Sequence, residues 1–95
     1  MATFLMLSNL TDEGAATIKK NPGRIKEVNK EVEAMGVKIV SQYAVIGPFD
    51  FATILEAPST EAVARVSIEM GARGSVRIQT LPLIPIDTFV SGVKR

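Results

Sequence analysis

Apolar residues fill both alternating sets of the first strand-like stretch, Thr3–Ser8. Phe4 and Met6 form one set, and Leu5 and Leu7 form the other, so both faces of a strand here are apolar. This pattern is typical of a central strand that is covered on two sides.

Helical signals follow this strand. Thr11 or Asp12 can accept hydrogen bonds from the free N–H groups of a first helical turn, which predicts a helix start. Pro22 disfavours a helical conformation for the residue before it, so we expect a kink at 21–23 and a longer helix from Arg24. Gly36 is expected to end that helix as a left-handed cap. Its apolar stripe repeats at three and four residues: Ile25, Val28, Val32 and Met35.

The middle of the chain predicts a strand, a tight turn and another strand. The second strand is expected at 37–46, the turn at Gly47-Pro48-Phe49 and the third strand at 50–56. Ser59 or Thr60 is expected to cap the next helix, because either hydroxyl can accept from the first turn.

The last third of the chain predicts an edge strand and a short terminal helix. Residues 75–81 alternate strictly between apolar and polar side chains, and Pro82 and Pro85 are expected to end that strand. The segment 86–90 predicts a helix that packs Phe89 or Val90 on a neighbour.

The two halves of the chain resemble each other at an offset of 49 residues, with Leu5 matching Ile54 and Thr11 matching Thr60. A βαββαβ order with right-handed crossovers predicts one α+β domain over residues 1–95. The expected fold is ferredoxin-like, with an antiparallel sheet of order 4-1-3-2 and helices on one face.

The sheet face without helices is expected to be apolar. Depending on strand register, it would contain a share of Phe4, Met6, Val40, Phe51, Thr53 and Leu55. Covering a few such side chains is worth several kcal/mol, at about 25 cal/mol per Å². We therefore expect a homodimer or higher homo-oligomer in which two sheets pack face to face, as in a dimeric α/β barrel.

Charge argues against nucleic-acid and membrane partners. Eleven basic and ten acidic residues leave a net charge of +1, which gives no field to gather phosphates or anionic lipid. The stretches 5–10 and 47–52 loosely resemble the strand signatures of RNA-recognition domains. However, Met6 stands where a stacking aromatic is needed, and Asp50 would repel phosphate. The N-terminus lacks a basic signal-peptide region and no run is long enough to span a membrane, so we expect a cytoplasmic location.

The chain has no cysteine and no histidine. This excludes disulfides, thiol nucleophiles, thiolate metal sites and imidazole acid–base chemistry. No cofactor and no metal site are expected.

Four residues are candidates for binding a small-molecule ligand: Asp50, Tyr43, Arg24 and Arg77. Asp50 could hold a ligand or act as a base, although an Asp in a turn more often bonds nearby N–H groups. Tyr43 could donate to a substrate oxygen, or it could simply pack with its hydroxyl at an edge. Arg24 and Arg77, like Arg73, could bind an anion or pair with an acidic side chain.

The chain also resembles the GYD domain family along nearly its whole length. The resemblance is carried by these segments: Thr11–Gly14, Ile18-Lys19, Asn21–Arg24, Gly47–Asp50, Glu56–Pro58 and Gly71–Leu81. It implies a ferredoxin-like fold and oligomers, and it implies no catalytic residue. Phe49 stands where the family often has the tyrosine of its motif, so a phenol hydroxyl is not available at that position.

Two functions remain open. The preferred hypothesis is a non-catalytic oligomeric domain that binds a small molecule or a partner protein. The alternative is a cofactor-free enzyme, monooxygenase-like or isomerase-like, acting on a small apolar substrate in the barrel cavity. Antibiotic-biosynthesis monooxygenase-like proteins of the same architecture do this, which is an analogy at the level of fold.

Overall fold

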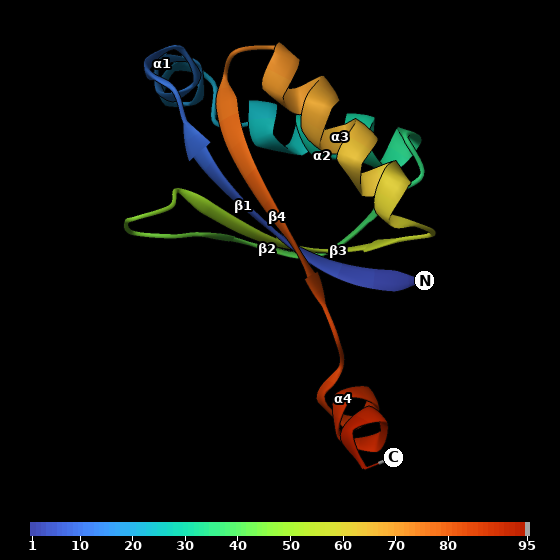
Figure 1. Cartoon of the computed structure of the whole chain (residues 1–95). Coiled ribbons are helices and arrows are strands. Elements are labelled where there is room, and N and C mark those ends of the chain that lie inside the picture. Colours follow the sequence, from blue (N-terminus) through green and yellow to red (C-terminus); the bar gives the residue numbers. More distant parts are fainter. Residues whose placement is uncertain (95) are drawn as a thin grey trace.

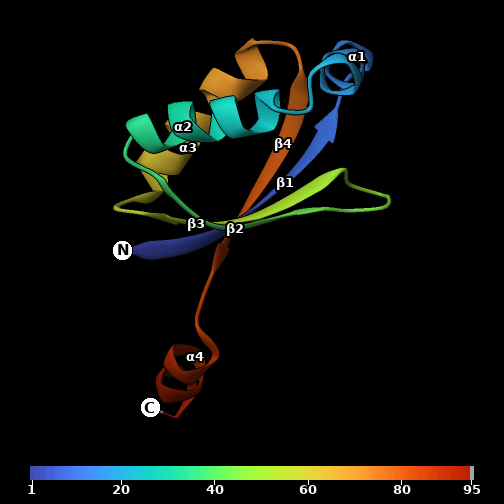
Figure 2. The same ribbon diagram turned by 180° about the vertical axis from the view of Figure 1, so that it is seen from behind.

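The computed structural model describes residues 1–94. It contains four strands and four helices, in this order: β1 (Ala2–Leu10), α1 (Asp12–Lys20), α2 (Arg24–Ala34), β2 (Lys38–Ala44), β3 (Phe51–Ala57), α3 (Thr60–Ala72), β4 (Val76–Leu83) and α4 (Ile86–Val93). The sheet order is β2-β3-β1-β4 with every neighbouring pair antiparallel, which confirms the predicted order 4-1-3-2. Helices α1, α2 and α3 lie on one face, and α4 lies on the other side of the sheet (Figures 1 and 2).

The helix ends follow the local signals in the sequence. The Thr11 hydroxyl accepts a hydrogen bond from the Gly14 N–H at 3.1 Å, and Ser59 accepts from the Ala62 N–H at 3.2 Å, so Ser59 rather than Thr60 caps α3. The break at 21–23 separates α1 from α2 as predicted. Gly36 adopts φ of 90° just beyond α2, in the left-handed region expected of it.

The end of β4 differs from the prediction. Pro82 lies inside the strand, opposite Phe4, and β4 continues to Leu83. A proline is tolerated there because β4 is an edge strand, which needs ladder hydrogen bonds on one side only. Helix α4 is present and extends beyond the expected 86–90 to Val93.

The core fills the space between the sheet and the helices. In the register, Phe4 lies opposite Leu55 and Met6 lies opposite Thr53, and all four side chains are buried under the helices. The helices complete this core with apolar side chains from α2 and α3: Val32, Val63, Val66 and Met70.

The other face of the sheet, called the open face below, is apolar at its centre but through different residues than expected. Leu5 lies between Ile54 and Leu81 in the register, and Leu7 lies two residues further along β1. The expectation named Phe4, Met6, Phe51, Thr53 and Leu55, and the register turns all of these toward the helices. From that set only Val40, at the β2 bulge and 50% exposed, lies off the helix-covered face. Both alternating sets of β1 are apolar, so the pattern alone could not decide which one the helices cover.

Helix α1 packs closely on the segment that leads into β4. A Cβ placed on Gly14 would lie 2.0 Å from the Ser75 carbonyl oxygen, which is backbone and cannot move aside cheaply. The Ser75 carbonyl also accepts a hydrogen bond from the Thr11 N–H at 3.0 Å. Glycine at position 14 is therefore required by this close approach.

Replacing Gly14 by alanine is expected to destabilise the fold by about 1–3 kcal/mol, because the overpacking outweighs the better helix propensity of alanine. The matched control is Gly71→Ala in α3, where a new Cβ meets nothing within 4 Å. That control should stabilise by about 0.5–1 kcal/mol. Urea unfolding followed by circular dichroism measures both. Equal effects of the two substitutions would contradict the proposed close packing.

Candidate functional site

Asp50 is hydrogen-bonded to the backbone of β1. Its carboxylate oxygen Oδ2 accepts a hydrogen bond from the Leu10 N–H at 2.8 Å, and its own N–H donates to the Ser8 carbonyl at 3.0 Å. The Asp50 carbonyl accepts from the Val45 N–H at 2.8 Å, which closes the connection between β2 and β3. Asp50 therefore attaches this connection to the end of β1.

The other three candidates do not meet at one place. Tyr43 lies opposite Ala52, and Arg77 lies opposite Asn9, so both are on the open face but on the two edge strands. Three strand spacings separate them, about 14 Å. Arg24 begins α2, on the helix-covered side of the sheet. Ligand binding by these residues stays a prediction, and any such ligand would contact them at separate places.

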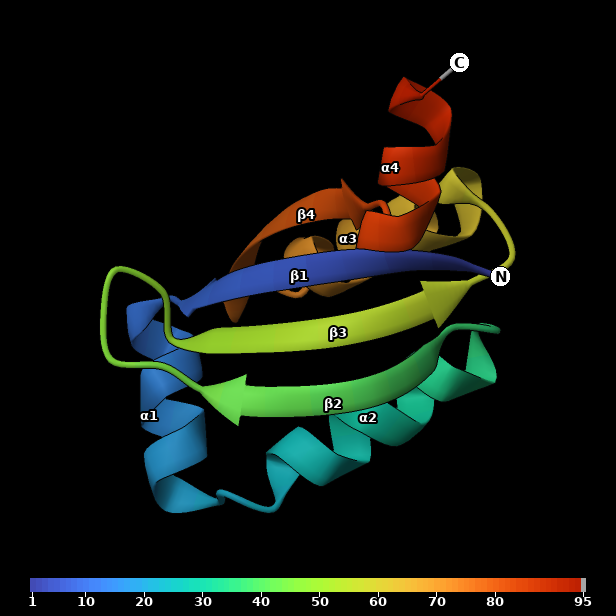
Figure 3. The same cartoon turned by 90° about the horizontal axis from the view of Figure 1, so that it is seen from below.

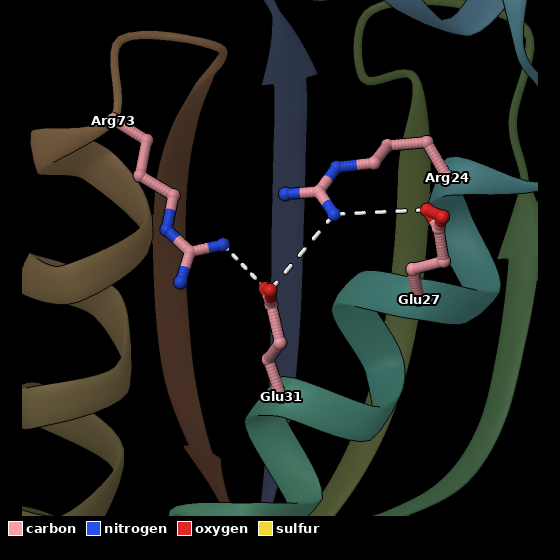
Figure 4. Close-up of polar contacts among 4 residues, drawn as sticks. All are labelled: Arg24, Glu27, Glu31 and Arg73. Atoms are coloured by element: carbon pink, nitrogen blue, oxygen red, sulfur yellow. Dashed lines mark hydrogen bonds and ion pairs between the residues drawn. The ribbon is translucent and has the colours of Figure 1, made fainter.

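Arg24 belongs to a cluster of four charged side chains that joins α2 to the end of α3 (Figure 4). Arg73 Nη1 donates to Glu31 Oε2, while Arg24 Nη1 lies 3.8 Å from Glu31 Oε1 and 3.7 Å from Glu27 Oε2. Glu31 thus lies between two guanidinium groups, as the figure shows. We call Arg24, Glu27, Glu31 and Arg73 the arginine–glutamate cluster.

The cluster changes the acidity of Glu31. The hydrogen bond from Arg73 lowers the pKa of Glu31 below its ordinary value of 4.5, and the positive charges of Arg73 and Arg24 act in the same direction. Partial desolvation opposes them and does not reverse the direction. Glu31 is therefore ionised throughout the neutral range.

A cavity of about 160 Å³ lies beside the cluster, between the helices and the sheet. Its walls are mostly apolar: α2 contributes Ile25, Val28 and Val32, and β3 contributes Phe51 and Leu55. Arg24 and Arg73 also line the cavity, whereas Glu27 and Glu31 do not.

Sequence reasoning placed Arg24 and Arg73 among possible anion-binding residues, and it did not identify Glu31 as their partner. The contact between Arg73 and Glu31 spans 42 residues, so no local spacing could reveal it. The cavity was also missed. The signal in the sequence that could have indicated the cavity was the pair of small residues Gly14 and Thr17 on α1, which both line it.

Within residues 1–94, no three His, Cys, Asp or Glu side chains are grouped so that they could hold a metal ion. None of the helices described is long and apolar enough to cross a membrane.

These features define a class: a ferredoxin-like α+β domain with helices on one sheet face, an apolar face left open and a cavity under the helices. The sequence model of the GYD domain matches residues 4–93. The chain therefore belongs to the GYD domain family, as the resemblance in its motifs predicted.

Two comparisons with known proteins extend this result. The chain is 50% identical over 95 residues to the "Glutamine synthetase and cystathionine beta-lyase binding protein" of Thermus thermophilus, covering 99% of this chain and 100% of that protein. Among solved structures, the crystal structure of FFRP-DM1 is similar in fold, with a TM-score of 0.55 and 20% sequence identity. That alignment covers 88% of this chain and 100% of FFRP-DM1.

Glu31→Gln is expected to lower the thermal midpoint slightly near neutral pH, by about one to three degrees, because the exposed cluster loses its central charge. Since the folded pKa of Glu31 is depressed, its contribution to stability is present above pH 4.5 and is lost as the pH falls through the lower folded value. The midpoints of the wild type and the variant should therefore converge below pH 4.5. Scanning calorimetry from pH 3 to 8 measures this.

The control is Glu33→Gln, on the same helix but outside the cluster. It should not reproduce the pH-dependent difference. A constant offset between Glu31→Gln and the wild type at every pH would contradict the role given to the Glu31 charge.

Proposed function

We propose that this protein is a non-catalytic binding protein that pairs with a second copy of itself and binds enzymes of amino-acid metabolism. The observation that carries the proposal is the apolar surface formed by the open face and α4. The alternative of a cofactor-free enzyme has no specific observation in its favour, because the carboxylate of Asp50 is bound to backbone and Tyr43 and Arg77 lie apart.

The open face supports self-association through its composition. Leu5, Leu7 and Ile54 lie at its centre, while Lys38 and Glu56 are paired at one corner with their charged atoms 4.0 Å apart. An apolar centre with a polar rim is the usual anatomy of a protein interface. Covering one Leu or Ile completely is worth about 1.5–3 kcal/mol.

Helix α4 supports a second copy as the occupant of this face. It follows β4 after the two residues Ile84 and Pro85, and it stands away from the sheet on the open side (Figures 1 and 3). Its large apolar side chains are exposed, with Phe89 at 51% and Val93 at 66%. A second sheet packed about 10 Å below the first would occupy the layer in which α4 lies. The helix would then flank the partner's sheet.

The dimensions of the face support the same arrangement. Four strands about 4.8 Å apart, each roughly seven residues long, present a face of roughly 20 Å by 23 Å. A stable interface covers about 800 Å² of surface on each partner. The projected area of this face alone is smaller than that. Helix α4 supplies the additional apolar area, so the proposed dimer uses both.

The relative from Thermus thermophilus supplies the class of partner. It is named for binding glutamine synthetase and cystathionine β-lyase, and the alignment covers that protein from end to end. We propose the same kind of partner for this chain. We also propose a cytoplasmic location, because such metabolic enzymes are found in the cytoplasm.

Ile54→Lys is expected to weaken self-association at least tenfold, because a lysine at the centre of a covered apolar face must be desolvated. The matched control is Ile68→Lys on α3, where the side chain is 74% exposed on the other side of the molecule. Sedimentation velocity over a range of concentrations measures the effect, and circular dichroism confirms that each variant is folded.

Phe89→Asp provides a second test, since it leaves the sheet unchanged. It should also weaken the dimer, because the proposed interface includes α4. A wild-type protein that stays monomeric at every concentration would refute self-association. Loss of assembly in Ile68→Lys would refute the assignment to the open face.

Binding to the proposed enzymes is measured by biolayer interferometry with the immobilised chain. Glutamine synthetase and cystathionine β-lyase of Thermus thermophilus are the analytes, and the Thermus relative on a second sensor is the positive control. We expect a dissociation constant in the micromolar range or tighter, about −8 kcal/mol. Binding of both enzymes by the relative and of neither by this chain would refute the proposed partner class.

A further inference from the structure

The cavity beneath the helices lies on the opposite side of the sheet from the open face. Its volume is about 160 Å³, and side chains from three helices and all four strands line it. An apolar cavity of about 150 Å³ in a protein stays dry and accepts a molecule the size of benzene. This cavity is therefore large enough for the compact apolar part of a small ligand.

The cavity results from the way in which α1 and α2 diverge. The break at 21–23 turns the chain, so that α1 crosses the end of the sheet while α2 runs along β2 (Figure 3). Four of the lining residues at this end of the sheet are small: Ser8, Gly14, Thr17 and Ser75. Their side chains do not fill the cavity, and Gly14 must remain glycine because of the close approach to Ser75.

The charges on the lining select the kind of ligand. Among the residues described, Arg24 and Arg73 are the charged side chains that line the cavity, and the two carboxylates of the cluster lie outside the lining. Each guanidinium has about five N–H donors. Glu31 engages one nitrogen of each, so most of the donors remain available (Figure 4).

We propose that this cavity binds a small carboxylic acid with a compact apolar body. The apolar body occupies the space next to Val28 and Phe51. The carboxylate lies at the rim, where it accepts from the N–H groups of Arg24 and Arg73 that Glu31 leaves free, because planar guanidinium groups bind carboxylates well. A branched or aromatic body of about six carbons matches the volume. The site is independent of the proposed dimer and of the enzyme partners, since it lies across the sheet from the open face.

The lining also predicts what the cavity rejects. An α-amino acid carries an ammonium group beside its carboxylate, and no carboxylate among the described residues lines the cavity to pair with it. Glu31, outside the lining, is already paired with Arg73 and Arg24. The polar pair nearby, Asn29 and Gln42, is already joined by hydrogen bonds of 2.7 Å and 3.2 Å. A desolvated ammonium without a partner is costly. The simple acid should therefore bind better than the amino acid with the same side chain.

The test is an NMR titration of the full chain labelled with ¹⁵N, with 4-methylpentanoate and 3-phenylpropanoate as probes. We expect saturable shifts of the amides of Thr17, Ile25 and Ile39 around the cavity, with no comparable shifts at Phe89 and Val93 on α4. Leucine and 4-methylpentanamide should each bind at least tenfold more weakly than 4-methylpentanoate, because they add an unpaired ammonium or lack the charge.

Variants separate the apolar and the charged part of the site. Val28→Phe fills the cavity with a larger side chain. Thr17→Phe obstructs its exposed rim and replaces the first variant as the test if that variant does not fold. Each should weaken 4-methylpentanoate binding about tenfold or more, as should Arg24→Met and Arg73→Met. Glu31→Gln should strengthen it several-fold, because it frees both arginines.

The proposal is overturned if neither acid gives saturable shifts at the cavity. It is also overturned if the amide binds as well as the acid, or if filling the cavity leaves affinity unchanged. Sedimentation of the same samples distinguishes this outcome from failure of the dimer, because the two sites lie on opposite faces of one sheet.

Discussion

The structure depends on one constraint: β1 and its neighbour β3 are apolar on both faces, and the helices of the chain cover one face. Phe4 and Leu55 are packed under the helices, while Leu5 and Ile54, one residue away on the same two strands, face the other side. Because adjacent side chains of a strand point to opposite faces, a strand that supplies the core with one set exposes the other. The open face is therefore the unavoidable counterpart of this core, and α4, which leaves the sheet on that side, adds exposed apolar side chains to it.

The two proposed sites share the strands that separate them. Met6 lines the cavity, and its neighbours Leu5 and Leu7 lie on the open face. A ligand that fills the cavity would pack against the back of the strand whose front is covered in the proposed dimer. The two sites differ in chemistry: the open face is apolar over a wide area, whereas the cavity is small and has two guanidinium groups at its rim, both paired with Glu31.

The sequence predicted those parts of the fold that have local causes. A hydroxyl cap, the proline at position 22 and the glycine at position 36 set the helix ends, and right-handed crossovers then fix the strand order. The register of β1 could not be predicted, because both of its alternating sets are apolar and either could have formed the core. The candidate site was even harder to predict from the sequence than the register. Asp50 was expected to bond N–H groups near it in sequence, but its partner, the Leu10 N–H, is 40 residues away, and Arg73 meets Glu31 over 42 residues. Such pairs depend on the packing of whole elements.

Several polar side chains of the chain hold elements of the fold together. Asp50 attaches the β2–β3 connection to β1, Thr11 and Ser59 cap helices, and the hydroxyls of Ser67 and Thr80 lie 3.0 Å apart and link α3 to β4. The groups that remain for recognition are of two kinds, an apolar surface and a pair of arginines with spare donors. Surfaces of the first kind select partners by shape and burial, and arginine pairs select carboxylates by charge and planar geometry. Both proposed roles are binding roles, and neither needs the histidine and cysteine that the chain lacks.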